Sequence, residues 1–205
     1  LGIKSALELG GASVCIQTGT TTELNLADFF RTNNMKYEAV TYEQNSEVRP
    51  SYLSGRCDVY TTDASGLAAT RSTFPNPNNH MILPEIISKE PLGPAVRQGD
   101  DQWADIIRWI YNATVTAEEK GITSANVNSM KTANDPEIKR LLGTEDNQGS
   151  QLGLSRDWAY QIIKQVGNYG EIFERNIGTN TPIGLARGLN DLWTRGGLQY
   201  SPPFR

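Results

Sequence analysis

The chain has 205 residues, of which 38% are hydrophobic, enough for one large domain or for a domain with an appendage. Its 19 basic and 23 acidic residues give a net charge of −4, which excludes the basic surface that a nucleic-acid-binding protein needs. No apolar run approaches the roughly 18 to 20 residues that span a bilayer, and the opening residues have no signal-peptide features. We therefore expect a soluble mature or processed product.

The first 84 residues alternate between strand-like and helix-like segments. Apolar alternation and β-branched residues mark the strands, and three- to four-residue apolar spacing marks the helices. The predicted strands are residues 12–17, 37–42, 57–62 and 81–83, and the predicted helices are residues 21–34, 46–55 and 63–72. In the second helix we expect Tyr52 and Leu53 to face inward, with Pro50 at the helix start or at a kink. This alternation predicts an α/β fold with a mainly parallel sheet.

Beyond Pro84 the pattern changes to an extended, proline-punctuated segment followed by helices. Residues 101–119 form a predicted amphipathic helix that Gly121 ends. From Asp135 onward we expect helix throughout, most clearly over residues 155–177, with Ser155 as the cap. Its apolar stripe consists of Trp158, Ile162, Val166, Tyr169 and Phe173. The second part of the chain is therefore predicted to be a helical region.

Two cysteines and a single histidine limit the chemistry of the chain. Cys15 and Cys57 each lie at or beside the start of a predicted strand, so they either form a bridge between neighbouring strands or remain two buried thiols. The only histidine, His80, lies in a loop rich in Pro and Asn, where we expect a surface residue. We therefore expect neither a metal site nor a Ser-His-Asp site.

The loop after the first strand has the composition of an anion-binding helix start. Gly19 permits a sharp turn, and Thr20 with Glu23 matches a capping box, so the helix should begin near Thr21. The N–H groups of Thr21 and Thr22 would then point outward at the positive end of the helix dipole. The alternative interpretation is an ordinary capped helix start.

A second loop offers the opposite charge. Asp63 follows the third predicted strand and precedes a helix of small residues. It fits either an N-cap or the partner of an ammonium group. A helix start that binds a carboxylate, beside an Asp that binds an ammonium group, would suit the two charges of an α-amino acid. Neither a Walker A ending nor a dinucleotide fingerprint is present, so we expect no cofactor.

Long stretches of the chain resemble the general L-amino-acid-binding proteins of bacterial ABC importers, which have the type II periplasmic-binding fold. The matching stretches run from end to end: SALELGGASVCIQTGTTTELNLADFF, GRCDVYTTDASGLAA, HMILPEIISKEPLGPAVRQGDDQW, DWAYQIIKQVGNYGEIFERNIG and GLNDLWTRGGLQYSPPFR. The resemblance implies a periplasmic protein of two α/β lobes that closes around an amino acid and delivers it to a membrane permease.

The resemblance also implies roles for individual residues. The threonine-rich loop, Thr20 to Thr22, would bind the ligand α-carboxylate, and Asp63 would bind the α-ammonium. A Cys15–Cys57 disulfide is implied within the same lobe. No catalytic residue is implied.

The resemblance further implies that a first lobe is missing. Residues 1–98 would be the second α/β lobe with its hinge crossings, and residues 99–205 would be a helical region that packs on the absent first lobe. That lobe would contain an Arg that clamps the ligand carboxylate. Exposed aromatic residues of the helical region could instead support a dimer.

Two other functions fit the same fold class. An enzyme similar to a dehydratase or a lytic transglycosylase would need a general acid or base in the cleft, and Asp63 is the only candidate. A ligand-sensing receptor module would need a transmembrane segment, which the printed sequence does not contain. We therefore expect a binding protein for transport.

Overall fold

The computed structural model describes residues 2–205, which divide into two compact units, residues 2–92 and Gly93–Arg205. The resemblance implies a boundary after residue 98 in place of residue 92. We call these parts unit 1 and unit 2 and describe each by itself. The assignment of unit 1 as the second lobe of a longer protein stays a prediction.

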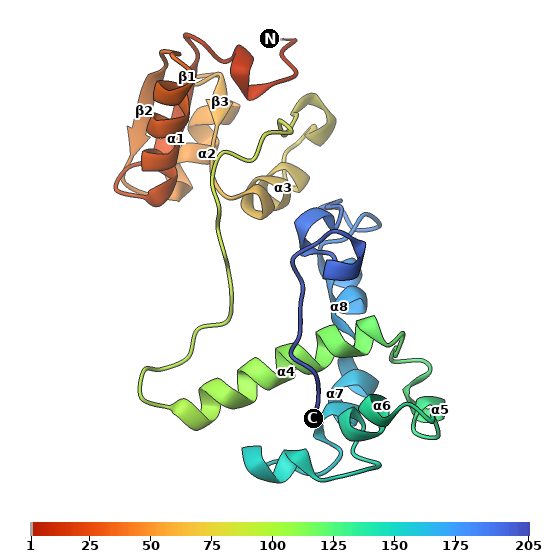
Figure 1. Cartoon of the computed structure of the whole chain (residues 1–205). Helices are drawn as coiled ribbons and strands as arrows, with labels where there is room; N and C mark the ends of the chain where they lie inside the picture. The colour runs from red at the N-terminus through yellow and green to blue at the C-terminus, as the bar shows by residue number, and fades with distance from the viewer. Residues whose placement is uncertain (1) are drawn as a thin grey trace. The chain divides into compact units, whose positions relative to one another are not determined.

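Unit 1 is built on a three-stranded parallel sheet with the strand order β2-β1-β3 (Figure 1). The strands are β1 (Ser13–Gln17), β2 (Glu38–Tyr42) and β3 (Val59–Tyr60). The central strand pairs with β2 from Ser13↔Glu38 to Gln17↔Tyr42, and with β3 through Val14↔Val59 and Cys15↔Tyr60. Helices α1 (Thr21–Thr32), α2 (Asn45–Leu53) and α3 (Ala64–Ser72) follow the three strands in turn. The predicted parallel α/β arrangement is confirmed.

The two faces of β1 bury different side chains because successive residues of a strand point in opposite directions. Val14 and Ile16 belong to a core cluster with Leu26 and Phe30 of α1. Cys15, on the other face, packs with Val48 of α2. The central strand is thus covered on both sides, which explains its uninterrupted apolar sequence.

Several local predictions for unit 1 are wrong. The third strand is only two residues long, and residues 81–83 form no strand. In α2 the fully buried residue is Val48, at 0% exposure, and Tyr52 packs partly buried against the same core cluster as predicted, whereas Leu53 is 38% exposed. Pro50 lies inside α2 and not at its start. Helix orientation depends on which residues the sheet covers, and this is not encoded in the helix alone.

Unit 2 is helical and has no sheet among its described residues. Its longest element, α4 (Asp101–Glu119), has the predicted bounds. The Asp100 side chain accepts a hydrogen bond from the N–H of Trp103 at 3.1 Å, and Gly121 follows the helix with φ +64°. The other elements are α5 (Val127–Met130), α6 (Pro136–Leu141), α7 (Trp158–Val166), α8 (Tyr169–Asn176) and three short 3-10 helices at Gln148–Leu152, Gly188–Asn190 and Trp193–Arg195.

The continuous helix predicted over residues 155–177 is broken. Gly167, with φ +87° and ψ −175°, separates α7 from α8, and Asn168 with Glu171 forms a capping box that starts the second helix. The first helix begins at Trp158 after Asp157, so Ser155 is not its cap. Val166 is 42% exposed and leaves the predicted stripe. Beyond residue 177 the chain is mostly irregular, contrary to the expectation of helix throughout.

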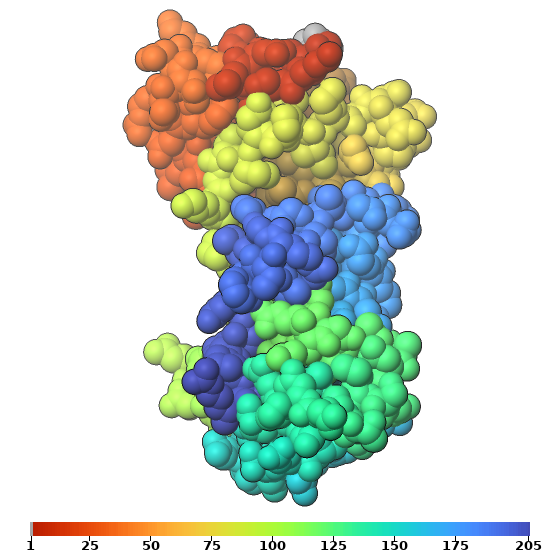
Figure 2. Space-filling model, turned by 45° about the vertical axis from the view of Figure 1, so that its right-hand side comes forward, coloured from red at the N-terminus to blue at the C-terminus, as the bar shows by residue number. Residues whose placement is uncertain are grey.

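The C-terminal segment packs along α4 within unit 2 (Figure 2). Thr116 donates a hydrogen bond to Ser201 at 2.9 Å, and the ring of Phe204 lies 5.2 Å from that of Trp109. Arg187 forms a bidentate ion pair with Glu118, at 3.1 and 3.0 Å.

No helix among residues 2–205 is both long and apolar enough to cross a membrane.

Candidate ligand site

The two predicted ligand loops leave neighbouring parallel strands of unit 1 at the same edge of the sheet. β1 ends at Gln17 and leads into the threonine-rich loop, and β3 ends at Tyr60 and leads to Asp63. Because β1 and β3 pair in parallel, their carboxyl ends meet at one edge. Ligands of open parallel sheets bind outside this edge, so the topology brings the two loops together.

Thr20 caps α1, which begins at Thr21 as the sequence predicts. The Thr20 hydroxyl accepts a hydrogen bond from the N–H of Glu23 at 3.2 Å and donates to the carbonyl of Gln17 at 2.8 Å. The capping box differs from its usual form, because the Glu23 carboxylate accepts the N–H of Gly19, at 2.7 Å, and not that of Thr20.

Three consecutive N–H groups are therefore free at the start of α1. Within residues 2–205, the N–H groups of Thr20, Thr21 and Thr22 have no acceptor. They lie at the positive end of the helix dipole, where an anion is stabilised. The Thr20 hydroxyl is already engaged, so this residue can offer a ligand its N–H, whereas Thr21 and Thr22 can offer hydroxyl and N–H groups.

Asp63 immediately precedes α3 but its side chain does not cap the helix. The half-buried carboxylate has no hydrogen bond or ion pair with any residue in the described part of the chain. Burial raises the pKa of Tyr60, and the charge of Asp63 adds to this increase, although hydrogen bonds to Asn45 and Thr70 oppose it. The capping interpretation of Asp63 is thus not supported, and its acceptor oxygens remain available.

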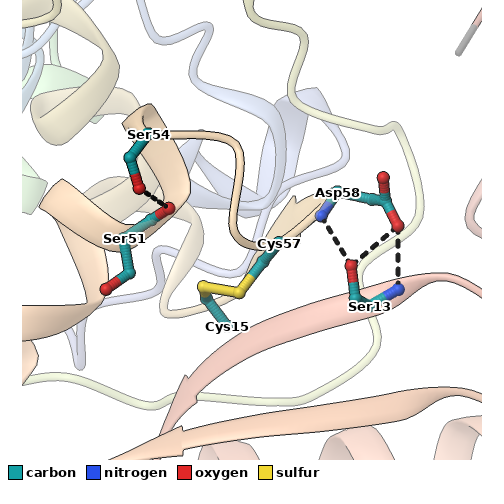
Figure 3. Close-up of a disulfide and its surroundings, with 6 residues drawn as sticks. All are labelled: Ser13, Cys15, Ser51, Ser54, Cys57 and Asp58. Atoms are coloured by element: carbon teal, nitrogen blue, oxygen red, sulfur yellow. Dashed lines mark hydrogen bonds between the residues drawn. A yellow bond between two sulfur atoms is a disulfide. The ribbon is translucent and has the colours of Figure 1, made fainter.

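A disulfide joins the two strands that carry these loops. Cys15 of β1 and Cys57, just before β3, are bonded with their Cα atoms 5.6 Å apart (Figure 3). Beside them, the Asp58 carboxylate accepts hydrogen bonds from the N–H and hydroxyl of Ser13 at 3.0 and 2.7 Å. The disulfide that the resemblance implies is present, and it fixes the short β1–β3 ladder.

Sequence reasoning missed Tyr60, whose hydroxyl donates to the Asn45 side chain at 3.1 Å and links β3 to the start of α2. An aromatic residue in a predicted strand gives no signal for such a polar contact. His80 is not a plain surface residue, because its Nδ1 lies 2.8 Å from the Tyr52 hydroxyl and its ring packs on Phe74. Over residues 2–205 no group of three or more potential metal ligands is found.

Comparison with known proteins gives close relatives along the entire chain. It is 62% identical to the general L-amino acid-binding periplasmic protein AapJ of Rhizobium johnstonii and 58% identical to the glutamate/glutamine/aspartate/asparagine-binding protein BztA of Rhodobacter capsulatus. A solved structure, an ABC transporter periplasmic binding protein from Brucella ovis with glutathione bound, matches with a TM-score of 0.93 and 59% identity. The chain is thus similar along its full length to periplasmic amino-acid-binding proteins. No protein-family model matches it.

These periplasmic amino-acid-binding proteins are longer than the chain. All of the chain is matched in each comparison, but it spans only 61% of AapJ, 61% of BztA and 64% of the Brucella ovis protein. The high structural similarity confirms the predicted periplasmic-binding-protein fold.

Proposed function

We propose that the protein binds an L-amino acid in the periplasm and delivers it to the membrane permease of an ABC importer. The N–H groups of Thr20, Thr21 and Thr22 receive the α-carboxylate, and Asp63 receives the α-ammonium. The observation that carries this proposal is the placement of the two loops at the carboxyl ends of the adjacent strands β1 and β3.

The electrostatics of the two loops support a zwitterionic ligand. The free N–H donors at the start of α1 favour a negative group. The Asp63 carboxylate, which does not cap α3, favours a positive group at the same edge of the sheet. Charge-assisted hydrogen bonds of this kind contribute about 1.5–3 kcal/mol each. The names of the relatives, which are amino-acid-binding proteins, support the same function over catalysis or sensing.

The ligand range includes γ-glutamyl compounds as a second candidate. The related Brucella ovis structure has glutathione bound. The γ-glutamyl residue of glutathione carries a free α-carboxylate and α-ammonium, so its head group is chemically that of an amino acid. A site that binds the α-carboxylate and α-ammonium accepts both an amino acid and glutathione, provided that it has room for the rest of the peptide.

Isothermal titration calorimetry with glutamate, glutamine, histidine and glutathione tests the assignment, using the complete gene product. Asp63→Asn should weaken binding by about 10- to 150-fold, the equivalent of one charge-assisted hydrogen bond. Asp58→Asn is the matched control, because it removes the same charge from unit 1 at a carboxylate bonded to Ser13. Equal affinities of the Asp63 variant and the wild type would contradict the proposal.

The proposed missing lobe has its own test. If an Arg from a first lobe clamps the α-carboxylate, the 205-residue chain should bind amino acids feebly, because it lacks that bidentate contact. Micromolar binding by the 205-residue chain alone would contradict the proposal that half of the site lies in a first lobe.

A further inference from the structure

Unit 1 contains two α-helices with a Glu at the third helical position, and these two Glu residues act differently. In α2, Glu47 accepts the N–H of Gln44, the residue that caps its helix, at 3.1 Å. In α1, Glu23 reaches past the capping Thr20 and accepts the N–H of Gly19 at 2.7 Å. The same residue type therefore binds the N–H of the capping residue in α2 but leaves that N–H without an acceptor among the described residues in α1, which we call the open helix start.

The open helix start is held by a small set of contacts to Glu23. Its carboxylate also lies 3.3 and 3.5 Å from the Thr18 hydroxyl, a donor on the other side of Gly19. Gly19 has φ +71°, a conformation that glycine adopts readily and other residues rarely do. A charge-assisted bond to its N–H keeps this turn in one conformation.

We propose that Glu23 is a positioning residue of the ligand loop: by holding Gly19 it leaves the N–H groups of Thr20, Thr21 and Thr22 free and aligned for the ligand carboxylate. This inference rests on the proposed function. A normal capping box would have consumed the Thr20 N–H and left two donors in place of three. Glu23 contacts the loop and acts on the ligand through it.

The alignment matters because a flexible glycine turn would have to be ordered at each binding event. Fixing one residue's backbone opposes binding because it removes conformational freedom, so a turn that is ordered beforehand makes binding tighter. Losing that order should weaken binding by about tenfold. The effect should not depend on the global stability of the protein.

The experiment compares Glu23→Ala and Glu23→Gln with Glu47→Ala in the complete gene product. Affinity for glutamate is measured by calorimetry, and amide exchange of Gly19 is measured by NMR without ligand. Glu23→Ala should lose about tenfold in affinity and the protection of the Gly19 amide. Glu23→Gln should stay within about threefold of the wild type, because its amide oxygen can still accept the Gly19 N–H.

Glu47→Ala is the matched control, since it removes a capping Glu from a helix with no ligand role. It should lower thermal stability as Glu23→Ala does but leave affinity unchanged. Wild-type affinity in Glu23→Ala, or an equal loss of affinity in Glu47→Ala, would overturn the role of Glu23. Failure of the wild-type protein to bind any of the four ligands would overturn the proposed function, and this role with it.

Discussion

The Cys15–Cys57 disulfide should contribute a large part of the free energy of unfolding of unit 1. It closes a loop with a sequence separation of 42 and joins β1 to the residues before a strand only two residues long. Both cysteines are buried, at 0% and 4% exposure, so we expect the thiols to stay enclosed after reduction. The native contacts therefore change little, and the main effect of reduction is to raise the conformational entropy of the unfolded chain.

The expected magnitude follows from the loop length. Loop-closure entropy for about 42 residues corresponds to roughly 4 kcal/mol at 25 °C. Unit 1, with about 90 residues, should have a total stability of roughly 5–14 kcal/mol. With a urea dependence of about 2 kcal/mol per molar, reduction should lower the unfolding midpoint by roughly 2 M.

The distribution of aromatic residues makes the assay specific. All four tryptophans, Trp103, Trp109, Trp158 and Trp193, lie in unit 2, so tryptophan fluorescence follows that unit alone. Hydrogen exchange of peptides from residues 2–92, measured by mass spectrometry across a urea series, follows unit 1. Reductant should shift the exchange transition of unit 1 and not the fluorescence transition.

A double variant, Cys15→Ala with Cys57→Ala, provides the control. It should unfold near the midpoint of the reduced wild type and should not respond to reductant. If oxidised and reduced unit 1 differ by less than about 1 kcal/mol, the loop-entropy reasoning is refuted. If the alanine variant responds to reductant, the shift does not come from the disulfide.

Four substitutions test the packing within each of the two units. Val48→Ala should lower the free energy of unfolding of unit 1 by about 2 kcal/mol, because it leaves a cavity at a fully buried site. Leu53 is exposed, so Leu53→Ala should lower it by less than about 0.5 kcal/mol. A larger loss for Leu53→Ala than for Val48→Ala in urea unfolding would show that the other face of α2 is buried. Pro50→Ala should stabilise unit 1 by about 1–2 kcal/mol in the same assay, since it restores a helical N–H, and a loss of stability would contradict this. Glu118→Gln should destabilise unit 2 by about 3 kcal/mol, followed by tryptophan fluorescence, because Arg187 is only 14% exposed and would lose its bidentate carboxylate partner, keeping the longer 3.6 Å contact with Asp191. A cost below about 1 kcal/mol would show that the pair is dispensable.

Features decided within a few residues were predictable from the sequence. The bounds of α4 match because its apolar spacing and Gly121 act within the helix itself. The start of α1 at Thr21 follows from the Thr20 side chain, which needs no distant partner. The alternation of strand and helix similarly indicated a parallel α/β unit, since parallel neighbours need crossover connections.

Features that depend on distant partners were not predictable in this way. The third strand is short because only Val59 and Tyr60 lie in ladder register with β1, which the sequence of the strand does not show. The helix predicted over residues 155–177 breaks at Gly167, where the capping of α8 by Asn168 outweighs the continued apolar spacing. A periodic pattern shows which residues share a face but not where the chain turns.

The candidate site divides along the same line. The sequence by itself determined its chemical groups, a threonine-rich helix start and an acid after a strand, because these are local motifs. Only the tertiary structure decided that they share one edge, because strand order and the Cys15–Cys57 bond join segments 42 residues apart. It also decided that Glu23 bonds to Gly19 and not to Thr20, because this choice depends on the backbone path of the turn.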